Sequence, residues 1–115
     1  MYFKLILEKA EPSNDFYFTE IPNDTSNIAK EHTLSMEDAE LLYDKYAERI
    51  NVECDVYIGD GDANYFNAEQ CKKIIKWLEK NIDNEDNIKL KDHLTILLQY
   101  AKEAVELGTW IIIEI

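Results

Sequence analysis

Residues 53–80 read ECDVYIGDGDANYFNAEQCKKIIKWLEK, and they indicate a strand, an acidic turn and a helix in succession. Apolar and polar side chains alternate through residues 52–58, which predicts a strand over residues 53–58. Two glycines and two aspartates follow at residues 59–62, and these residue types favour a tight turn. Asn67, with Gln70 three residues later, forms a variant of the capping box, so we expect a helix to begin directly after Asn67.

The C-terminal part of the chain predicts one more helix and one more strand. Apolar residues recur at helical spacing from about residue 88 to residue 107, and Gly108 stands where a helix commonly ends. Residues 109–115 are short, β-branched and apolar, as is typical of a strand in the centre of a sheet. We expect the N-terminal strand to be its neighbour.

The N-terminal part predicts two strands, a loop and a helix. Residues 2–8 alternate in polarity, and the aromatic run at residues 16–21 indicates a second, antiparallel strand. Residues 22–34 are interpreted as a loop with one helical turn around Ile28. Ser35 can cap the helix that follows, and its apolar residues recur at three- and four-residue steps as far as Ile50.

These elements predict one α+β domain over residues 1–115, in the order strand, strand, helix, strand, helix, helix, strand. The simplest assembly is a mostly antiparallel sheet of about four strands with three helices packed on it. A chain of 115 residues can bury enough surface to fold without a metal or a disulfide. The sequence does not predict the strand order.

The net charge of −12 restricts the partners. Residues 31–66 hold ten acidic side chains against Lys45 and Arg49, so about two thirds of the excess lies in the middle third. Nucleic-acid binding needs a basic footprint, and an anionic membrane repels an acidic protein. The charge therefore favours a basic protein partner, or a well-solvated helix face.

The cysteines and histidines are isolated in the sequence. Cys54 and Cys71 form neither a CxxC motif nor a zinc-like set, so we interpret both as buried free thiols of a reducing compartment. His32, in the predicted loop, and His93, on the predicted third helix, are expected to have surface or packing roles. The N-terminus does not resemble a signal peptide and no apolar run is long enough to span a membrane, so we expect a cytoplasmic location.

Asp60, Asp62 and Asn64 follow the D-x-D-x-N pattern that begins an EF-hand calcium loop. The rest of the loop departs from that pattern, because Tyr65 replaces its glycine and Cys71 replaces its final glutamate. A small calcium- or ligand-binding domain that uses the Asp60–Asn64 turn is therefore the alternative interpretation. No cofactor is predicted.

Tyrosines and carboxylates around the acidic turn predict a contact surface. Tyrosine is favoured at interface centres, and aromatic side chains rimmed by carboxylates suit a basic partner. The predicted contact set is Asp44, Glu48, Asp55, Tyr57, Asp60, Asp62 and Tyr65.

The acidic run MEDAELLYDKYAERI (residues 36–50) and the run DVYIGDGDANYF (residues 55–66) resemble those of the small acidic immunity proteins that bacteria make against the toxins of rival strains. They are also similar to phage-encoded inhibitors of nucleic-acid enzymes. The resemblance implies a cytoplasmic protein that blocks a toxin by tight surface contact, and it carries no catalytic residue. We therefore expect a non-enzymatic binding protein that covers a basic surface.

Overall fold

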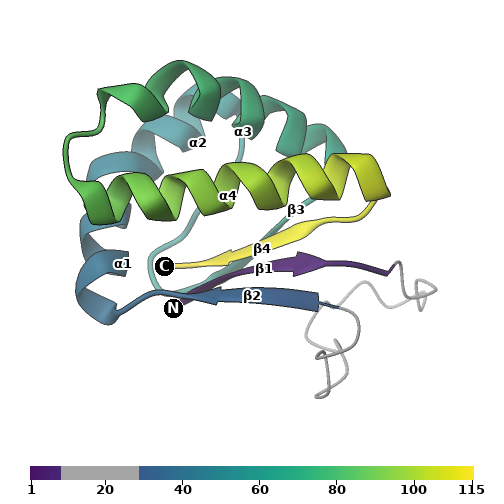
Figure 1. The fold of residues 1–115 in the computed structure, drawn as a ribbon, viewed down its shortest axis with the longest axis horizontal. Coiled ribbons are helices and arrows are strands. Elements are labelled where there is room, and N and C mark those ends of the chain that lie inside the picture. The colour runs from purple at the N-terminus through teal and green to yellow at the C-terminus, as the bar shows by residue number, and fades with distance from the viewer. Residues whose placement is uncertain (9–28) are drawn as a thin grey trace.

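The computed structural model describes residues 1–8 and 29–115, which form one four-stranded sheet with helices on one face (Figure 1). The strands are β1 (Tyr2–Ile6), β2 (Ala29–Thr33), β3 (Ala63–Phe66) and β4 (Ile111–Glu114). Their order across the sheet is β2-β1-β4-β3, and every neighbouring pair is antiparallel. The predicted α+β class, the order of elements and the central place of the last strand beside β1 are confirmed.

The helical layer of the described residues contains three segments. The first is continuous and comprises α1 (Met36–Leu42), the π-helical η2 (Tyr43–Ala47) and α2 (Glu48–Cys54). The second is α3 (Ala68–Asn81), which continues into the short 3-10 helix η3 (Ile82–Asn84). The third is α4 (Ile88–Leu107), which lies across the sheet in Figure 1.

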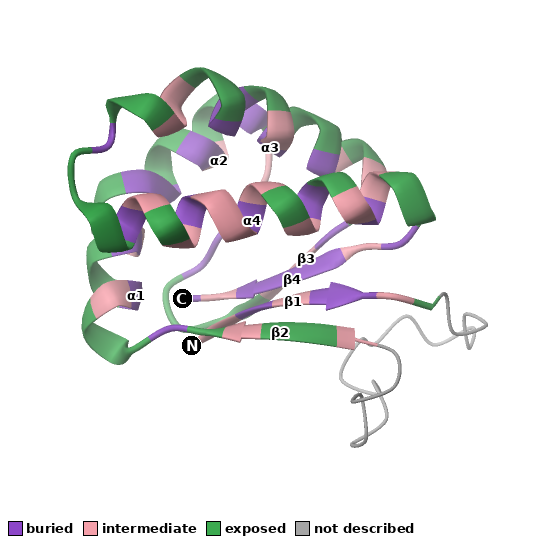
Figure 2. Ribbon diagram, in the orientation of Figure 1, coloured by how far each residue is buried: buried purple, intermediate pink, exposed green. Residues whose placement is uncertain are grey.

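The core lies between the sheet and this helical layer, where the buried residues of both layers face each other (Figure 2). Phe3 is paired with Ile113, and Leu5 with Ile111, so their side chains lie together on the helix-facing side of the sheet. Leu94, Leu97 and Ala101 of α4 are buried in the same cluster. The alternation of side chains in β1 and β4 therefore determines which face the helices cover.

The predicted helix caps at Ser35, Asn67 and Gly108 are confirmed. Ser35 Oγ accepts a hydrogen bond from the backbone N–H of Asp38 at 3.1 Å. Asn67 and Gln70 form a reciprocal capping box, with both bonds at 2.9 Å. Gly108 ends α4 in the left-handed conformation at φ 68°, where a side chain would strain the backbone.

The predicted strand over residues 16–21 lies outside the described residues, as does the helical turn around Ile28. The predicted loop over residues 22–34 is wrong for Ala29–Thr33, which form β2. The segment AKEHT lacks the apolar alternation of a strand, because its side chains are mostly exposed and, within residues 1–8 and 29–115, it lies at the edge of the sheet.

The predicted strand over residues 53–58 is also wrong. The first helical segment continues to Cys54, and the third strand is β3, which begins after eight intervening residues. Ile50 and Cys54 are both buried and lie four residues apart, so the apolar stripe of the helix extends past the predicted end. Val52, which the strand prediction placed on the same face as Cys54 and Ile58, is 75% exposed, whereas those two residues are buried.

We predict that Asn67→Ala lowers the free energy of unfolding by about 1 kcal/mol, because the first turn of α3 loses its cap. Urea unfolding followed by circular dichroism measures this loss. The matched control is Asn84→Ala in η3, where the side chain is exposed and the unfolding midpoint should stay unchanged. Equal losses in the two variants would contradict the capping role of Asn67.

Candidate functional site

The acidic loop, residues 55–62, begins where α2 ends. Asp55 has a left-handed backbone at φ 53°, and the N–H of Val56 returns a hydrogen bond to the carbonyl of Asn51 at 3.2 Å. This tight ending turns the chain away from the helix axis. The chain then reaches β3 through eight residues, and their exposed members are Asp55, Tyr57, Asp60, Gly61 and Asp62.

Side-chain amides at both ends hold the acidic loop in one conformation. The Asn51 side chain accepts from the N–H of Ile58 at 2.7 Å and donates to its carbonyl at 3.1 Å, as a paired strand would. Asn64 Oδ1 accepts from the N–H of Gly59 at 2.8 Å. Ile58 itself is buried in the core. The loop is therefore anchored in its middle, although it contains no regular structure.

The side chains of Tyr57 and Asp62 both approach Gly59 closely. A Cβ placed on Gly59 would lie 2.9 Å from the Tyr57 hydroxyl oxygen and 2.8 Å from Asp62 Oδ2. The bare glycine thus allows an aromatic side chain and a carboxylate to approach the same point of the backbone. The Tyr57 ring is nevertheless 64% exposed, so it is available to a partner.

The structure brings together some of the predicted contact residues and separates others. Asp55, Tyr57, Asp60 and Asp62 share the acidic loop, and Asp44 and Glu48 are exposed on the first helical segment. Tyr65 pairs with Ile112 and alternates with the core residue Phe66, so it points to the sheet face opposite the helices. Burial and the nearby carboxylate of Glu114 raise the pKa of Tyr65. Tyr65 therefore does not belong to the same surface as Asp44 and Glu48.

The predicted cation-binding pattern is only partly available. Asn64, the third residue of D-x-D-x-N, lies in β3, and its side-chain oxygen already accepts from Gly59. In residues 1–8 and 29–115, no three histidine, cysteine, aspartate or glutamate side chains are grouped in a way that could hold a metal ion. These observations do not favour the calcium-binding alternative.

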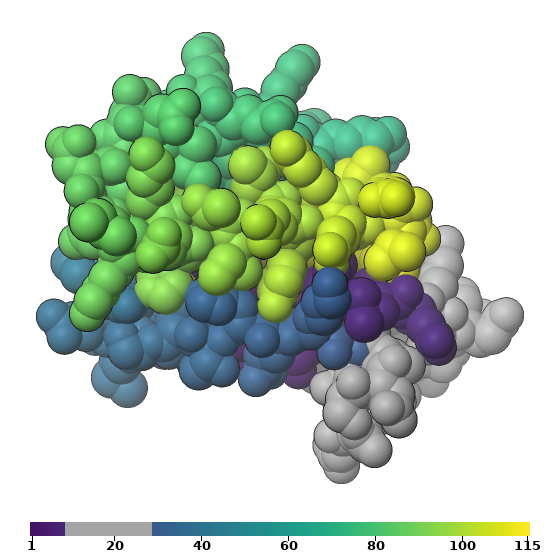
Figure 3. Space-filling model, in the orientation of Figure 1, coloured from purple at the N-terminus to yellow at the C-terminus, as the bar shows by residue number. Residues whose placement is uncertain are grey.

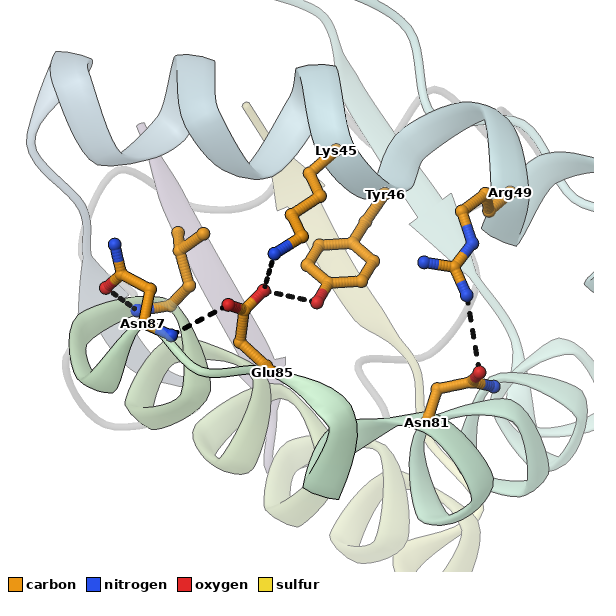
Figure 4. Close-up of polar contacts among 7 residues, drawn as sticks. Lys45, Tyr46, Arg49, Asn81, Glu85 and Asn87 are labelled. Atoms are coloured by element: carbon orange, nitrogen blue, oxygen red, sulfur yellow. Dashed lines mark hydrogen bonds and ion pairs between the residues drawn. The ribbon is translucent and has the colours of Figure 1, made fainter.

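A second polar cluster lies between η2 and the α3–α4 connection (Figure 4). The carboxylate of Glu85 accepts hydrogen bonds from the Tyr46 hydroxyl, from Lys45 Nζ at 2.7 Å and from the backbone N–H of Asn87 at 2.9 Å. The Glu85 side chain is only 1% exposed. Sequence reasoning missed this residue, because Glu85 stands in a polar run, DNEDN, that is typical of an exposed connector.

The environment of Glu85 keeps it ionised. Burial raises its pKa, but the hydrogen bonds from Lys45, Tyr46 and Asn87 outweigh that effect and lower the pKa to about 2. The same burial and hydrogen bond raise the pKa of Tyr46. Glu85 and Tyr46 thus act as a buried anion and its neutral donor, which ties the π-helical turn to the start of α4.

An aromatic and cationic stack extends this cluster along α3. The Tyr46 and Trp77 rings meet edge to face at 5.7 Å, and the Arg49 guanidinium lies 5.5 Å from the first ring and 5.2 Å from the second. Trp77 Nε1 donates to Glu53 Oε2 at 2.6 Å, and Arg49 donates to Asn81 at 3.3 Å. The polar ends of these side chains are all paired, which indicates a structural clamp rather than a reaction site.

A third polar feature is a chain of three side chains from three elements. Asp38 of α1 accepts from His93 Nε2 of α4 at 2.9 Å, and His93 Nδ1 lies 2.8 Å from His32 Nε2 of β2. Sequence reasoning placed His32 in a loop and found no local partner for either histidine. The residues lie 55 and 61 positions apart, so no sequence spacing could have shown this contact.

The two cysteines are buried free thiols. Their hydrogen bonds go to backbone carbonyls and not to these histidines. Cys54 Sγ donates to the carbonyl of Lys73, and Cys71 Sγ donates to that of Phe66, each at 3.6 Å. Burial raises the pKa of Cys54 to about 11 and that of Cys71 to about 12. Both thiols are therefore protonated at neutral pH and are poor nucleophiles.

The chain matches no protein-family model, and comparisons with curated proteins and with solved structures gave no significant match. None of the helices in the described ranges is both long and apolar enough to cross a membrane. The arrangement of side chains is therefore the basis for the functional argument.

We predict that the buried anion makes the protein acid-sensitive between about pH 4.5 and pH 2. The folded pKa of Glu85 lies below its ordinary value of 4.5, so its contribution is complete above 4.5 and is lost as the pH falls towards about 2. Glu85→Gln should lower stability at neutral pH by about 1–3 kcal/mol and flatten this acid dependence. Urea unfolding at a series of pH values tests both effects.

The matched control for Glu85 is Asp83→Asn, because the Asp83 side chain is 88% exposed and lies 3.9 Å from its cation. It should change stability by less than about 0.5 kcal/mol. Tyr46→Phe combined with Glu85→Gln should cost less than the sum of the single changes, since the first removes and the second weakens the same hydrogen bond. Strict additivity would show that the contact contributes nothing.

Proposed function

We propose that this protein is a non-enzymatic, acidic binding protein, an immunity protein or inhibitor that neutralises a toxin or nucleic-acid enzyme by covering its basic surface. The observation that carries the proposal is the acidic loop, in which exposed Tyr57 and Asp62 both approach the backbone at Gly59. An exposed aromatic side chain surrounded by carboxylates matches the surface of a basic partner.

Charge supports this proposal because it is concentrated near the loop. Asp55, Asp60 and Asp62 are exposed within it, and Glu48 is exposed on α2, where Val52 follows one turn later. A surface with a single sign of charge accelerates the encounter with an oppositely charged partner. Val52 adds a second exposed apolar side chain, at 75% exposure.

Rigidity supports the proposal as well. The hydrogen bonds of Asn51 and Asn64 hold the acidic loop without a partner present, and Ile58 anchors it in the core. A binding loop that is already ordered loses less conformational entropy on association. The loop is therefore suited to tight binding, whereas the protonated thiols offer no nucleophile for an enzyme.

The proposed site of action is the cytoplasm. Cys54 and Cys71 are both free and buried in the described structure. Free thiols are typical of reducing compartments, in which a toxin can be neutralised before it damages the producing cell.

The test is co-purification with the products of the genes that flank this one, followed by an affinity measurement on any complex. We expect Tyr57→Ala to weaken binding at least about 30-fold, as a central aromatic anchor does. Raising the salt from about 0.05 M to about 0.5 M should weaken binding of the unchanged protein at least about tenfold, because exposed charges are screened. Absence of a complex with any flanking gene product would contradict the proposal.

Gly59→Ala tests the geometry of the loop separately from its charge. The new methyl group must displace Tyr57 and Asp62, so we expect weaker binding, with little change in stability because both displaced atoms are side-chain ends. The matched control is Ile88→Ala, which removes an apolar side chain that is 77% exposed at the start of α4. Equal affinity of the two variants would show that the loop does not touch the partner.

A further inference from the structure

The Asp38–His93–His32 chain links the edge strand β2 to the helical layer. β2 pairs with β1 on one side, and β1 is its only strand neighbour among the described residues. On its helix-facing side β2 has two tethers to α4, the His32–His93 hydrogen bond and the pair of Lys30 with Glu103 at 3.2 Å. Figure 3 shows the segment that includes β2, in blue, directly beside α4, in green to yellow.

The chemistry of the three groups determines where the protons lie. An ionised carboxylate can only accept, so His93 Nε2 carries a proton towards Asp38. When both imidazoles are neutral, His93 Nδ1 is then an acceptor and His32 Nε2 must donate to it. The chain is fully satisfied in this state.

The Asp38–His93–His32 hydrogen bonds can be kept when one proton is added, but not when two are added. With one added proton, His93 becomes an imidazolium beside Asp38. Its Nδ1–H then donates to His32 Nε2, and neutral His32 carries its own proton on Nδ1 instead of Nε2. With a second proton, both nitrogens across the 2.8 Å contact carry hydrogen and both rings are positive. The hydrogen bond is then lost and replaced by repulsion.

The charged groups around the two imidazole rings do not neutralise the positive charge that a second proton would add. Asp38 of α1 is the carboxylate bonded to the chain, and Lys89 of α4 lies close enough to lower its pKa. From β1 the ring of Phe3 packs on His32 at 5.9 Å and brings no charge. On β2 itself, Glu31 pairs with Lys4 and Lys30 pairs with Glu103. One negative charge therefore faces two imidazoles.

We propose that this chain is a proton-operated latch that holds β2 against α4 and opens when both imidazoles are protonated. Burial and the neighbouring His93 lower the pKa of His32 below its ordinary value of 6.5. A lowered pKa means that the latch contributes its full stability above 6.5 and loses it as the pH falls below that value. The latch is independent of the proposed binding function.

Hydrogen exchange measured by NMR tests the latch. Protection factors, which are corrected for intrinsic exchange, should fall at least about tenfold for the amides of β2 between about pH 7.5 and pH 5, because one pKa unit corresponds to a factor of ten. Those of the central strand β4 serve as the internal reference and should stay unchanged. An equal fall in both strands, or no fall in β2, would overturn the proposal.

Two variants separate the latch from general destabilisation. In His32→Gln the amide N–H can still donate to His93 Nδ1 but does not titrate, so protection of β2 should become independent of pH. Glu103→Gln removes the charge pair with Lys30, and its pH dependence should match that of the unchanged protein. If the protection factors of β2 fall with pH as much in His32→Gln as in the unchanged protein, the proposal is overturned.

A direct measurement needs no variant. Ring-nitrogen chemical shifts of the unchanged protein should show two successive protonation steps, with the second displaced below the first by the shared contact. Independent titration of both rings near pH 6.5 would overturn the proposal.

Discussion

The pairing of β4 with both β1 and β3 is the interaction on which the rest of the structure depends. Without β4, the paired strands β1 and β2 would not belong to the same sheet as the short strand β3. Its inward residues Ile111 and Ile113 are paired with Phe3, Leu5 and Phe66 on the neighbouring strands. These side chains form the apolar sheet face against which α4 packs. The position of the acidic loop follows, because the loop must run from the end of α2 to β3 at the far edge.

Sequence reasoning succeeded where local chemistry determines the structure. The caps at Ser35, Asn67 and Gly108 depend on a few adjacent residues, and α3, α4 and β4 carry uninterrupted periodic patterns. It failed where a segment fits both the helical and the strand periodicity of apolar residues, or fits neither of them. Residues 50–58 fit both a helical and an alternating apolar pattern. The structure is helical as far as Cys54, whose side chain is buried in the core. The strand β2 carries no apolar alternation, and its backbone pairing with β1 determines its conformation.

The same limit applies to the candidate sites. The acidic loop was predictable because its charges and glycines are contiguous, although its residues had been divided between a strand and a turn. The exposure of Val52 and the approach of Tyr57 and Asp62 to Gly59 depend on where α2 ends, which the sequence did not predict. Glu85 and the two histidines acquire partners only through packing of distant elements, so each looked like an ordinary surface residue. Polar groups of this kind become recognisable only when burial is known.

The central place of β4 also has a consequence for synthesis of the protein. Because β4 is the last strand in chain order, the sheet cannot be completed until residue 114 has left the ribosome. Until then β1 lacks a long-range partner on one side, and β3 has no strand beside it, so both expose unpaired backbone groups. Formation of such non-local pairs is slow compared with that of helices. The nascent chain is therefore expected to hold a helical layer before it has a sheet, and to be most vulnerable to aggregation and proteolysis until β4 has emerged.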